Sequence, residues 1–375
     1  MEFSIFLVTL SLSVLALEIT AEKKVICYFA SWSQNRAGKG KFTVADIDAS
    51  ICTHYIWSFV NIEDNKIVIS KGNASNGIRE FAALHSRNPE AKLLVAVGGA
   101  ANSVGANYSK MVSTKQSRNE FIDSAVDVLK EYNLDGLDID WEYPAFKGGV
   151  PSDRENFVLL LKELRERFNQ DYLLTVALHP GERIAKKAYD IPGISQHVDF
   201  INLMTYNFHG AWENRTGHPS GLHGNGQISV ESLVKYWLDK GSPKEKLIVG
   251  MTAYGKSWTL SDPNSHGVGA NATGVGQPGL YTKKPGTLAY YELCEQINAG
   301  KLTVVFDEQT YAPYAYGDNQ WVGYEDIRSA KGKASFIQNM GLAGAMLWTI
   351  DLDDFRGSCN DKFPLLKSIN SILRN

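Results

Sequence analysis

Eight short apolar runs, rich in β-branched residues, recur along the chain and predict the strands of one sheet. The runs lie at 25–30, 55–60, 92–97, 136–141, 173–178, 200–205, 247–252 and 344–349. Nearly continuous apolar strands that alternate with helices are typical of a parallel sheet covered by helices on its outer face. Eight such units predict an α/β fold, the closed (β/α)8 TIM barrel.

The segments between these runs have the pattern of amphipathic helices. One helical face at 118–132 carries the apolar side chains Phe121, Ala125, Val128 and Leu129. Ser152 and Glu155 form an S-x-x-E pattern ahead of another apolar repeat. This pattern predicts a capping box at the start of that helix.

One interval is much longer than the others, because 97 residues separate the starts of the last two runs (247 and 344). That distance is too long for one strand–helix unit. The extra stretch at 254–326 is rich in Gly, Tyr and β-forming residues, and we interpret it as a small α+β insertion subdomain between strand 7 and helix 7. The barrel itself then comprises 22–253 and 327–375.

The N-terminal segment 1–21 reads as a signal peptide. Its apolar stretch from Phe3 to Leu17 is too short for a comfortable membrane span and is followed by small residues. The segment before it carries Glu2 and no Lys or Arg, so a retained membrane anchor is the alternative. We expect a secreted, extracellular protein that has no contact with a membrane after cleavage and is a monomer.

Secretion changes how the four cysteines, Cys27, Cys52, Cys294 and Cys359, are interpreted. An even number of cysteines in an oxidising compartment predicts two disulfides, for which three pairings are possible. No C-x-x-C pair is present, so a zinc or redox site is not expected. Four N-x-S/T sequons are candidate glycosylation sites: Asn73, Asn107, Asn214 and Asn271.

Charge and motifs exclude several other classes of function. The net charge is −3 and no basic run occurs, so no nucleic-acid partner is expected. The eight histidines are scattered without an H-E-x-x-H motif, so no catalytic metal is expected. The residues 274–279 match G-x-G-x-x-G, but they include Pro278 and open no helix after a strand, so we interpret them as a loop and expect no cofactor.

The run LDGLDIDWEYP at 134–144 contains the strongest candidates for catalytic residues. Because side chains alternate along a strand, Asp138, Asp140 and Glu142 share the face that points into the barrel, opposite Leu137 and Ile139. Neighbouring buried carboxyls cannot all ionise easily, so at least one pKa must rise. Glu142 lies nearest the C-terminal end of its strand, where barrel active sites form, and a raised pKa suits a general acid.

DGLDIDWEYP resembles the signature of the family 18 glycoside hydrolases, the chitinases and chitinase-like proteins. KLLVAVGG, LMTYNFHGAW and GLAGAMLWTIDLDDF resemble the family's motifs on strands three, six and eight, and they occur in the family's order. The resemblance extends from about Lys24 to the C-terminus. The GGA variant, and the absence of a chitin-binding module after the barrel, are most similar to short insect gut-type chitinases, which consist of a catalytic domain alone.

The resemblance implies an endo-acting chitinase that cleaves chitin or chitooligosaccharides with retention, the acetamide of the substrate serving as nucleophile. It implies that Glu142 is the proton donor and then the base, that Asp140 orients the acetamide, and that Asp138 tunes Asp140. Tyr206 would donate to the acetamide carbonyl. The implied substrate-binding residues are Trp348, Tyr143, Met204, Asn207, Tyr28, Phe59, Gly98, Gly99, Trp32 and Trp212. The implied disulfides are Cys27–Cys52 and Cys294–Cys359.

Three positions depart from the family pattern. Ala100 stands where a tryptophan is usual, Asn207 where an aspartate is usual, and Lys256 where many members have arginine. The first two changes favour a second hypothesis, a catalytically weak or inactive chitin-binding lectin. Such relatives typically replace the acid of the signature, whereas Glu142 is present here. A third hypothesis, an endo-N-acetylglucosaminidase that acts on glycoproteins, fits the other three motifs less well.

Overall fold

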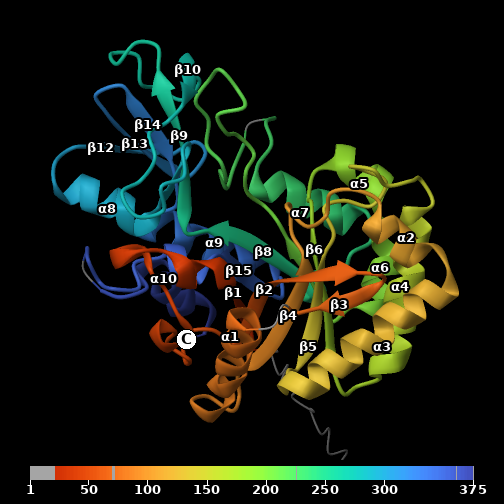
Figure 1. Ribbon diagram of the computed structural model, residues 1–375. Helices are drawn as coiled ribbons and strands as arrows, with labels where there is room; N and C mark the ends of the chain where they lie inside the picture. The colour runs from red at the N-terminus through yellow and green to blue at the C-terminus, as the bar shows by residue number, and fades with distance from the viewer. Residues whose placement is uncertain (1–21, 70–71, 225, 360, 375) are drawn as a thin grey trace, which may run out of the picture.

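A computed structural model of the chain describes residues 22–69, 72–224, 226–359 and 361–374, so the predicted signal peptide lies outside the described residues. Within these ranges, eight parallel strands close a barrel, and helices surround it (Figure 1). The strands pair in the order β1–β2–β4–β5–β6–β7–β8–β15, and β15 pairs with β1 to close the ring. The predicted fold class is confirmed, since each apolar run forms one barrel strand.

The barrel strands are β1 (Lys24–Ala30), β2 (His54–Glu63), β4 (Lys92–Gly98), β5 (Gly136–Asp140), β6 (Leu173–Leu178), β7 (Phe200–Leu203), β8 (Leu247–Thr252) and β15 (Gly344–Trp348). A short strand, β3 (Lys66–Val68), forms a hairpin with the end of β2. The helices around the barrel are α1 (Asn73–Ala82), α2 (Asn107–Ser113), α3 (Lys115–Tyr132), α4 (Asp153–Phe168), α5 (Glu182–Ala188), α6 (Ile191–His197), α7 (Val230–Asp239), α9 (Ile327–Met340) and α10 (Pro364–Leu373). None of the helices in the described ranges is both long and apolar enough to cross a lipid bilayer.

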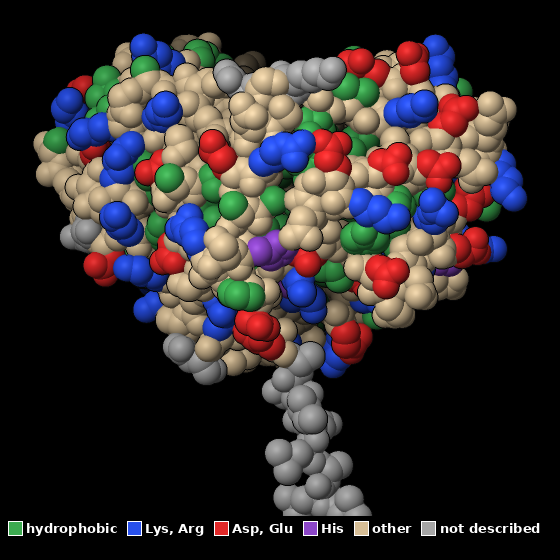
Figure 2. Space-filling view, turned by 60° about the horizontal axis from the view of Figure 1, so that its bottom comes forward, with side chains coloured by type: hydrophobic (Ala, Val, Ile, Leu, Met, Phe, Trp, Pro, Cys, Tyr) green, Lys and Arg blue, Asp and Glu red, His purple; other side chains and the backbone are tan. Residues whose placement is uncertain are grey.

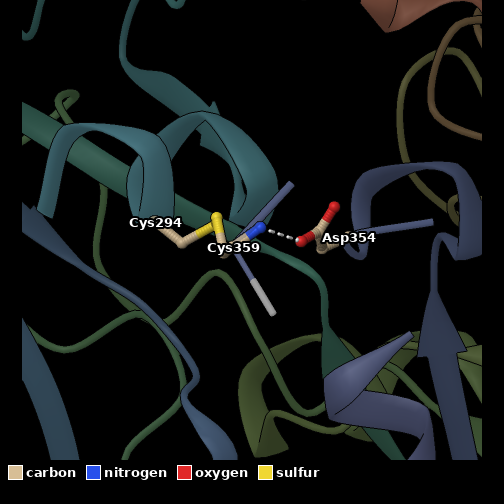
Figure 3. Close-up of side chains that lie close together, drawn as sticks. All are labelled: Cys294, Asp354 and Cys359. Atoms are coloured by element: carbon tan, nitrogen blue, oxygen red, sulfur yellow. Dashed lines mark hydrogen bonds between the residues drawn. A yellow bond between two sulfur atoms is a disulfide. The ribbon is translucent and has the colours of Figure 1, made fainter. Parts of the chain in front are cut away.

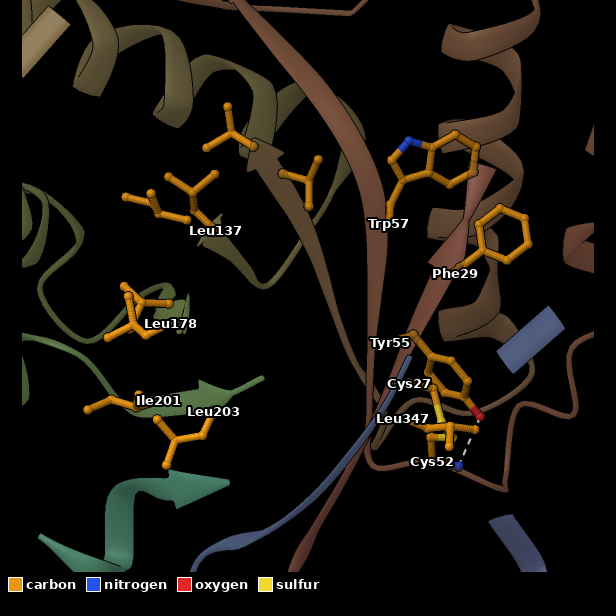
Figure 4. Close-up of a cluster of buried hydrophobic side chains, with 14 of the residues drawn as sticks. Cys27, Phe29, Cys52, Tyr55, Trp57, Leu137, Leu178, Ile201, Leu203 and Leu347 are labelled. Atoms are coloured by element: carbon orange, nitrogen blue, oxygen red, sulfur yellow. Dashed lines mark hydrogen bonds between the residues drawn. A yellow bond between two sulfur atoms is a disulfide. The ribbon is translucent and has the colours of Figure 1, made fainter. Parts of the chain in front are cut away.

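Side chains on the barrel strands form two apolar layers. One set points outward against the helices, and Figure 4 shows part of it, including Phe29, Trp57 and Leu137. The other set, which includes Ile26 and Ile56, fills the interior of the barrel. Because both faces of each strand are buried, the strands appear in the sequence as unbroken apolar runs rather than as alternating ones.

The capping box predicted at Ser152 and Glu155 is wrong. Helix α4 begins at Asp153, and the side chain of Ser152 makes no capping hydrogen bond. The buried carboxylate of Asp153 instead accepts hydrogen bonds from the backbone N–H groups of Val150 (2.8 Å) and Ala145 (3.1 Å). One carboxylate oxygen can accept several donors, so Asp153 ties the loop that follows Glu142 to the start of α4.

The chain between β8 and α9 folds into a second, antiparallel sheet that extends away from the barrel in Figure 1. Its strands are β9 (Tyr254–Leu260), β10 (Ala272–Val275), β11 (Thr287–Ala289), β12 (Thr303–Asp307), β13 (Ala312–Gly317) and β14 (Gln320–Gly323), and it includes one helix, α8 (Tyr290–Asn298). Apolar residues such as Leu288, Leu293 and Ala315 form a separate small core here. The predicted α+β insertion between the seventh strand and its helix is confirmed, while the domain boundaries at 254 and 326 stay a prediction.

Two disulfides join segments that are distant in the sequence. Cys27 on β1 pairs with Cys52, just before β2, and Cys294 on α8 pairs with Cys359, in the loop before α10. This is the pairing that the resemblance implies. Asp354 lies beside the second disulfide, where its carboxylate accepts the N–H of Cys359 at 2.8 Å (Figure 3). Among the described residues, Cys294, Asp354 and Cys359 are the one set of three potential metal ligands that converge, and both sulfurs are used in the disulfide.

The surface has no dominant sign of charge on the face that Figure 2 shows, where basic and acidic side chains are interspersed. Three of the sequon asparagines, Asn107, Asn214 and Asn271, are exposed in the structure. Their positions leave room for the glycans that the sequence predicts.

Candidate active site

The carboxyl groups of β5 lie in a row from the barrel interior to its C-terminal mouth. Asp138 is fully buried and accepts hydrogen bonds from Tyr28 Oη (2.8 Å), Thr175 Oγ1 (2.5 Å) and Asn202 Nδ2 (3.3 Å). Burial raises its pKa to about 6, although these hydrogen bonds act in the opposite direction. Asp138 therefore ionises less readily than an ordinary carboxyl, and three hydrogen bonds fix its orientation.

Asp140 lies next in the row and is almost completely buried. Burial raises its pKa well above the ordinary value, and the nearby Glu142 and Asp138 add to this effect. Its Oδ1 atom is buried and has no hydrogen-bond partner among the described residues. An unpaired buried oxygen of this kind is costly, so it marks a position where a ligand would supply a donor.

Glu142 lies two residues beyond Asp140, at the mouth of the barrel, and its side chain faces a cavity of about 580 Å3. Burial raises the pKa of Glu142 above its ordinary value, while the positive charge of Lys147 and a hydrogen bond with Tyr143 act in the opposite direction. Its backbone N–H donates to Ser103 Oγ at 3.0 Å. A carboxyl group with a raised pKa at the edge of a cavity can give up a proton and later take one back.

One wall of the cavity is aromatic. The rings of Trp348 and Phe59 are stacked with centroids 5.6 Å apart, and those of Phe59 and Trp32 with centroids 6.1 Å apart. Trp348 also packs against Tyr28, on the barrel side, at 5.2 Å. Flat apolar faces of this kind suit the C–H faces of sugar rings. Ala100 lies on the same cavity and presents only a methyl group.

The opposite wall comes from the segment after β7. Met204, Tyr206 and Asn207 all line the cavity. Burial holds the pKa of Tyr206 well above its ordinary value, so its phenol keeps its proton and can donate it. The side-chain oxygen of Asn207 accepts a hydrogen bond from Tyr254 Oη at 2.8 Å.

Five predicted site residues do not line the cavity: Asp138, Tyr28, Gly98, Gly99 and Trp212. Asp138 and Tyr28 lie buried beneath it. Gly98 and Gly99 have φ values of +121° and +78°, and a Cβ would lie 2.0 Å from the carbonyl oxygen of Asp140 at Gly98 and 2.4 Å from the ring of Phe59 at Gly99. The two glycines thus let the strands approach closely and place Asp140 and Phe59 in position.

Trp212, which was also predicted to bind substrate, lies outside the cavity lining and is largely exposed. Its ring lies 5.9 Å from Nζ of Lys256, which does line the cavity. Trp212 therefore flanks one end of the cavity, where a ligand longer than the cavity could reach it.

The motif analysis missed several residues that line the cavity. They are Arg36, His179, Tyr254, Thr282, Lys284, Thr287, Ala289, Thr349 and Leu352. Most come from loops or from the inserted sheet, where no periodicity indicates the direction of a side chain. His179 directly follows the predicted strand 173–178, and position at a strand's C-terminal end could have identified it. Burial and the charge of Arg183 lower the pKa of His179 to about 4, so it is neutral near pH 7.

A parallel β/α barrel with a row of acids at its mouth is the arrangement found in glycoside hydrolases and in proteins that resemble them. Residues 24–353 match Glycosyl hydrolases family 18, and the chain belongs to this family. It is 38% identical to mouse chitotriosidase-1 over 93% of this chain and 78% of that protein.

Solved structures agree with the family assignment. The fold is similar to that of Group IV chitinase from Ostrinia furnacalis, with a TM-score of 0.91 and 38% identity over 94% of this chain and all of that chain. It is also similar to human YKL-39, described as a pseudo-chitinase with retained chitooligosaccharide binding, with a TM-score of 0.88 and 37% identity over 94% of this chain and all of that chain. The family thus includes both hydrolases and proteins that bind without cleaving.

Proposed function

We propose that the protein is an endo-acting chitinase that hydrolyses β-1,4 linkages between N-acetylglucosamine units in chitin and chitooligosaccharides. The observation that carries this proposal is the pair formed by Asp140 and Glu142. Asp140 offers a buried, unpaired oxygen beside Glu142, whose carboxyl group has a raised pKa, at the foot of an aromatic wall. A solved relative named as a chitinase, from Ostrinia furnacalis, has the same fold at 38% identity.

In this mechanism, Glu142 protonates the glycosidic oxygen while the acetamide carbonyl of the same sugar attacks the anomeric carbon. Asp140 accepts the acetamide N–H through its unpaired oxygen and stabilises the positive charge that develops. Tyr206 donates to the acetamide carbonyl, and Trp348 forms the floor under the ring. Glu142 then removes a proton from the water that opens the oxazolinium, so the anomeric configuration is retained.

Replacement of the acid tests the proposal. In Glu142→Gln, we expect the release of soluble oligosaccharides from chitin to fall by about 10²- to 10⁴-fold, because the proton donor is lost. The activity of the unmodified protein should fall as the pH rises through the raised pKa of Glu142, where the proton is lost. The measurement is a product profile on defined chitooligosaccharides, with Glu155→Gln, which alters an exposed carboxylate on α4, as the matched control. Equal release by Glu142→Gln and the unmodified protein would refute the proposal.

A chitooligosaccharide-binding protein with little or no activity is the second candidate function. Two observations favour it: the missing aromatic platform at Ala100 and the similarity to human YKL-39. Binding of chitooligosaccharides without release of any product by the unmodified protein would support this candidate.

We also propose that the mature protein is extracellular and monomeric. The two disulfides support the first point, because disulfides persist in oxidising compartments. Intact mass and gel filtration of protein collected from the medium of secreting cells would test cleavage near residue 21, glycosylation and the oligomeric state together.

A further inference from the structure

The cavity wall that the inserted sheet forms carries a partly buried positive charge. Lys256 lies on β9, lines the cavity and is only partly exposed. Its Nζ lies 5.2 Å from the ring centroid of Tyr254, and its one hydrogen bond is a long one to Thr287 Oγ1, at 3.5 Å. Among the described residues, no carboxylate forms an ion pair with it.

A second positive charge faces the same space. Lys284 lines the cavity as well, and it too has no ion pair within the described part of the chain. Burial, and then the charge of Lys284, lower the pKa of Lys256 to about 8, so Lys256 keeps its positive charge in acidic and neutral solution. Arg36 differs, because it lies 2.6 Å from the buried carboxylate of Asp351, which compensates its charge.

The carboxyl groups across the cavity offset this charge only weakly. The pKa values of Asp140 and Glu142 are both raised, so these groups ionise less readily than ordinary carboxyls. The wall therefore carries the charges of Lys256, which is partly buried, and of Lys284, which is exposed. Near the partly buried Lys256, like charges repel more strongly than in bulk water. Such a wall discriminates between ligands of equal shape but different charge.

We propose that Lys256 and Lys284 act as a specificity filter that accepts N-acetylated sugar units and rejects units with a free amine at this wall. An acetamide is neutral, and its carbonyl oxygen can accept a hydrogen bond from Lys256. A glucosamine unit offers an ammonium group at the same position, which cannot accept that bond and is repelled by both lysines. The inference rests on the proposed function only in taking chitooligosaccharides as the ligand, and it concerns binding rather than turnover.

Calorimetric binding to the four chitotetraoses that each carry one glucosamine unit tests the filter, with fully acetylated chitotetraose as the reference. Glu142→Gln serves as the parent, so that cleavage does not interfere. For the isomer that places its amine beside Lys256 and Lys284, we expect an affinity at least about tenfold below that of fully acetylated chitotetraose. In the double variant with Lys256→Gln, this penalty should shrink to about twofold, and raised salt should reduce it in the parent.

Lys130→Gln is the matched control, since Lys130 is an exposed lysine in the last turn of α3, outside the cavity. It should leave the penalty of every isomer unchanged. The filter is refuted if no isomer shows a penalty that Lys256→Gln relieves, or if none of the oligomers binds. If the oligomers bind as expected but the unmodified protein releases nothing from chitin, the proposed hydrolysis fails and the filter stands.

Discussion

Asn207 differs from the aspartate that is usual at this position by one side-chain atom, and this difference changes the electrostatics around Glu142. It lies on the cavity and has a positive φ of 58°, a backbone conformation that asparagine and aspartate adopt more readily than most residues. Its side-chain oxygen accepts from Tyr254, a role that an aspartate could also fill. The difference is one negative charge near the cation that forms during catalysis.

We therefore expect Asn207→Asp to raise kcat by about two- to tenfold, because an added carboxylate stabilises the developing positive charge. The added charge also disfavours ionisation of nearby carboxyl groups, so the alkaline limb of the pH profile should move upward. Measurement of kcat on chitotetraose across pH 4–8 checks both effects. A kcat that is equal or lower at every pH would contradict this explanation of the substitution.

Ala100 is the second departure with a direct structural consequence. It is exposed on the cavity beside an otherwise aromatic wall. In Ala100→Trp, the added ring should lower the KM for chitohexaose by about two- to tenfold, since an aromatic contact contributes about 0.5–1.5 kcal/mol. Ala100→Val is the control, because it adds volume without a ring. An unchanged KM in Ala100→Trp would show that this position does not contact long substrates.

At the scale of elements, α10 depends on an acid that is distant in the sequence. Asp353 is fully buried, and its carboxylate accepts the backbone N–H groups of Leu365 (3.4 Å) and Leu366 (3.1 Å) in the first turn of the helix. Pro364 occupies the first position, where no N–H is needed. Asp353 thus caps α10 from eleven residues before the helix and joins it to the end of β15.

Burial raises the pKa of Asp353 to about 7. The folded state therefore binds a proton more tightly than the unfolded state does, and the contribution of this group to stability falls as the pH rises toward 7. The fall occurs between the ordinary pKa of 3.8 and the raised value, so we expect Asp353→Asn to flatten the pH dependence of the free energy of unfolding between about pH 4 and pH 7. Urea unfolding of both proteins across this range measures the difference.

The alanine variant separates the cap from the charge. Asp353→Ala should lower the free energy of unfolding by about 1–2 kcal/mol in acidic solution, because the helix loses its cap. Asp353→Asn, which keeps a side-chain oxygen as acceptor, should lower it less. If the asparagine variant keeps the original pH slope, Asp353 is not the group that titrates.

At the scale of the whole molecule, the barrel could be predicted from the sequence. Both faces of its strands are buried, so each strand appears in the sequence as a continuous apolar run. The acids on β5 were predictable from alternation alone, and the matched motifs added Trp348 and Tyr206. Contacts between distant segments were not predictable in this way. Lys256 and Lys284, both in the insertion, line the cavity at the barrel mouth. Asp153, and not Ser152, fixes the start of α4 through its hydrogen bonds.

The positions of the tryptophans make intrinsic fluorescence a probe of ligand binding. Trp32 and Trp212 are 44% and 62% exposed, and Trp348 is half-buried, whereas the other five tryptophans are at most 3% exposed. All three accessible rings line or flank one cavity. A collisional quencher such as acrylamide will therefore reach mainly these three, and a bound oligosaccharide will shield them, so that intrinsic fluorescence reads out occupancy without a label.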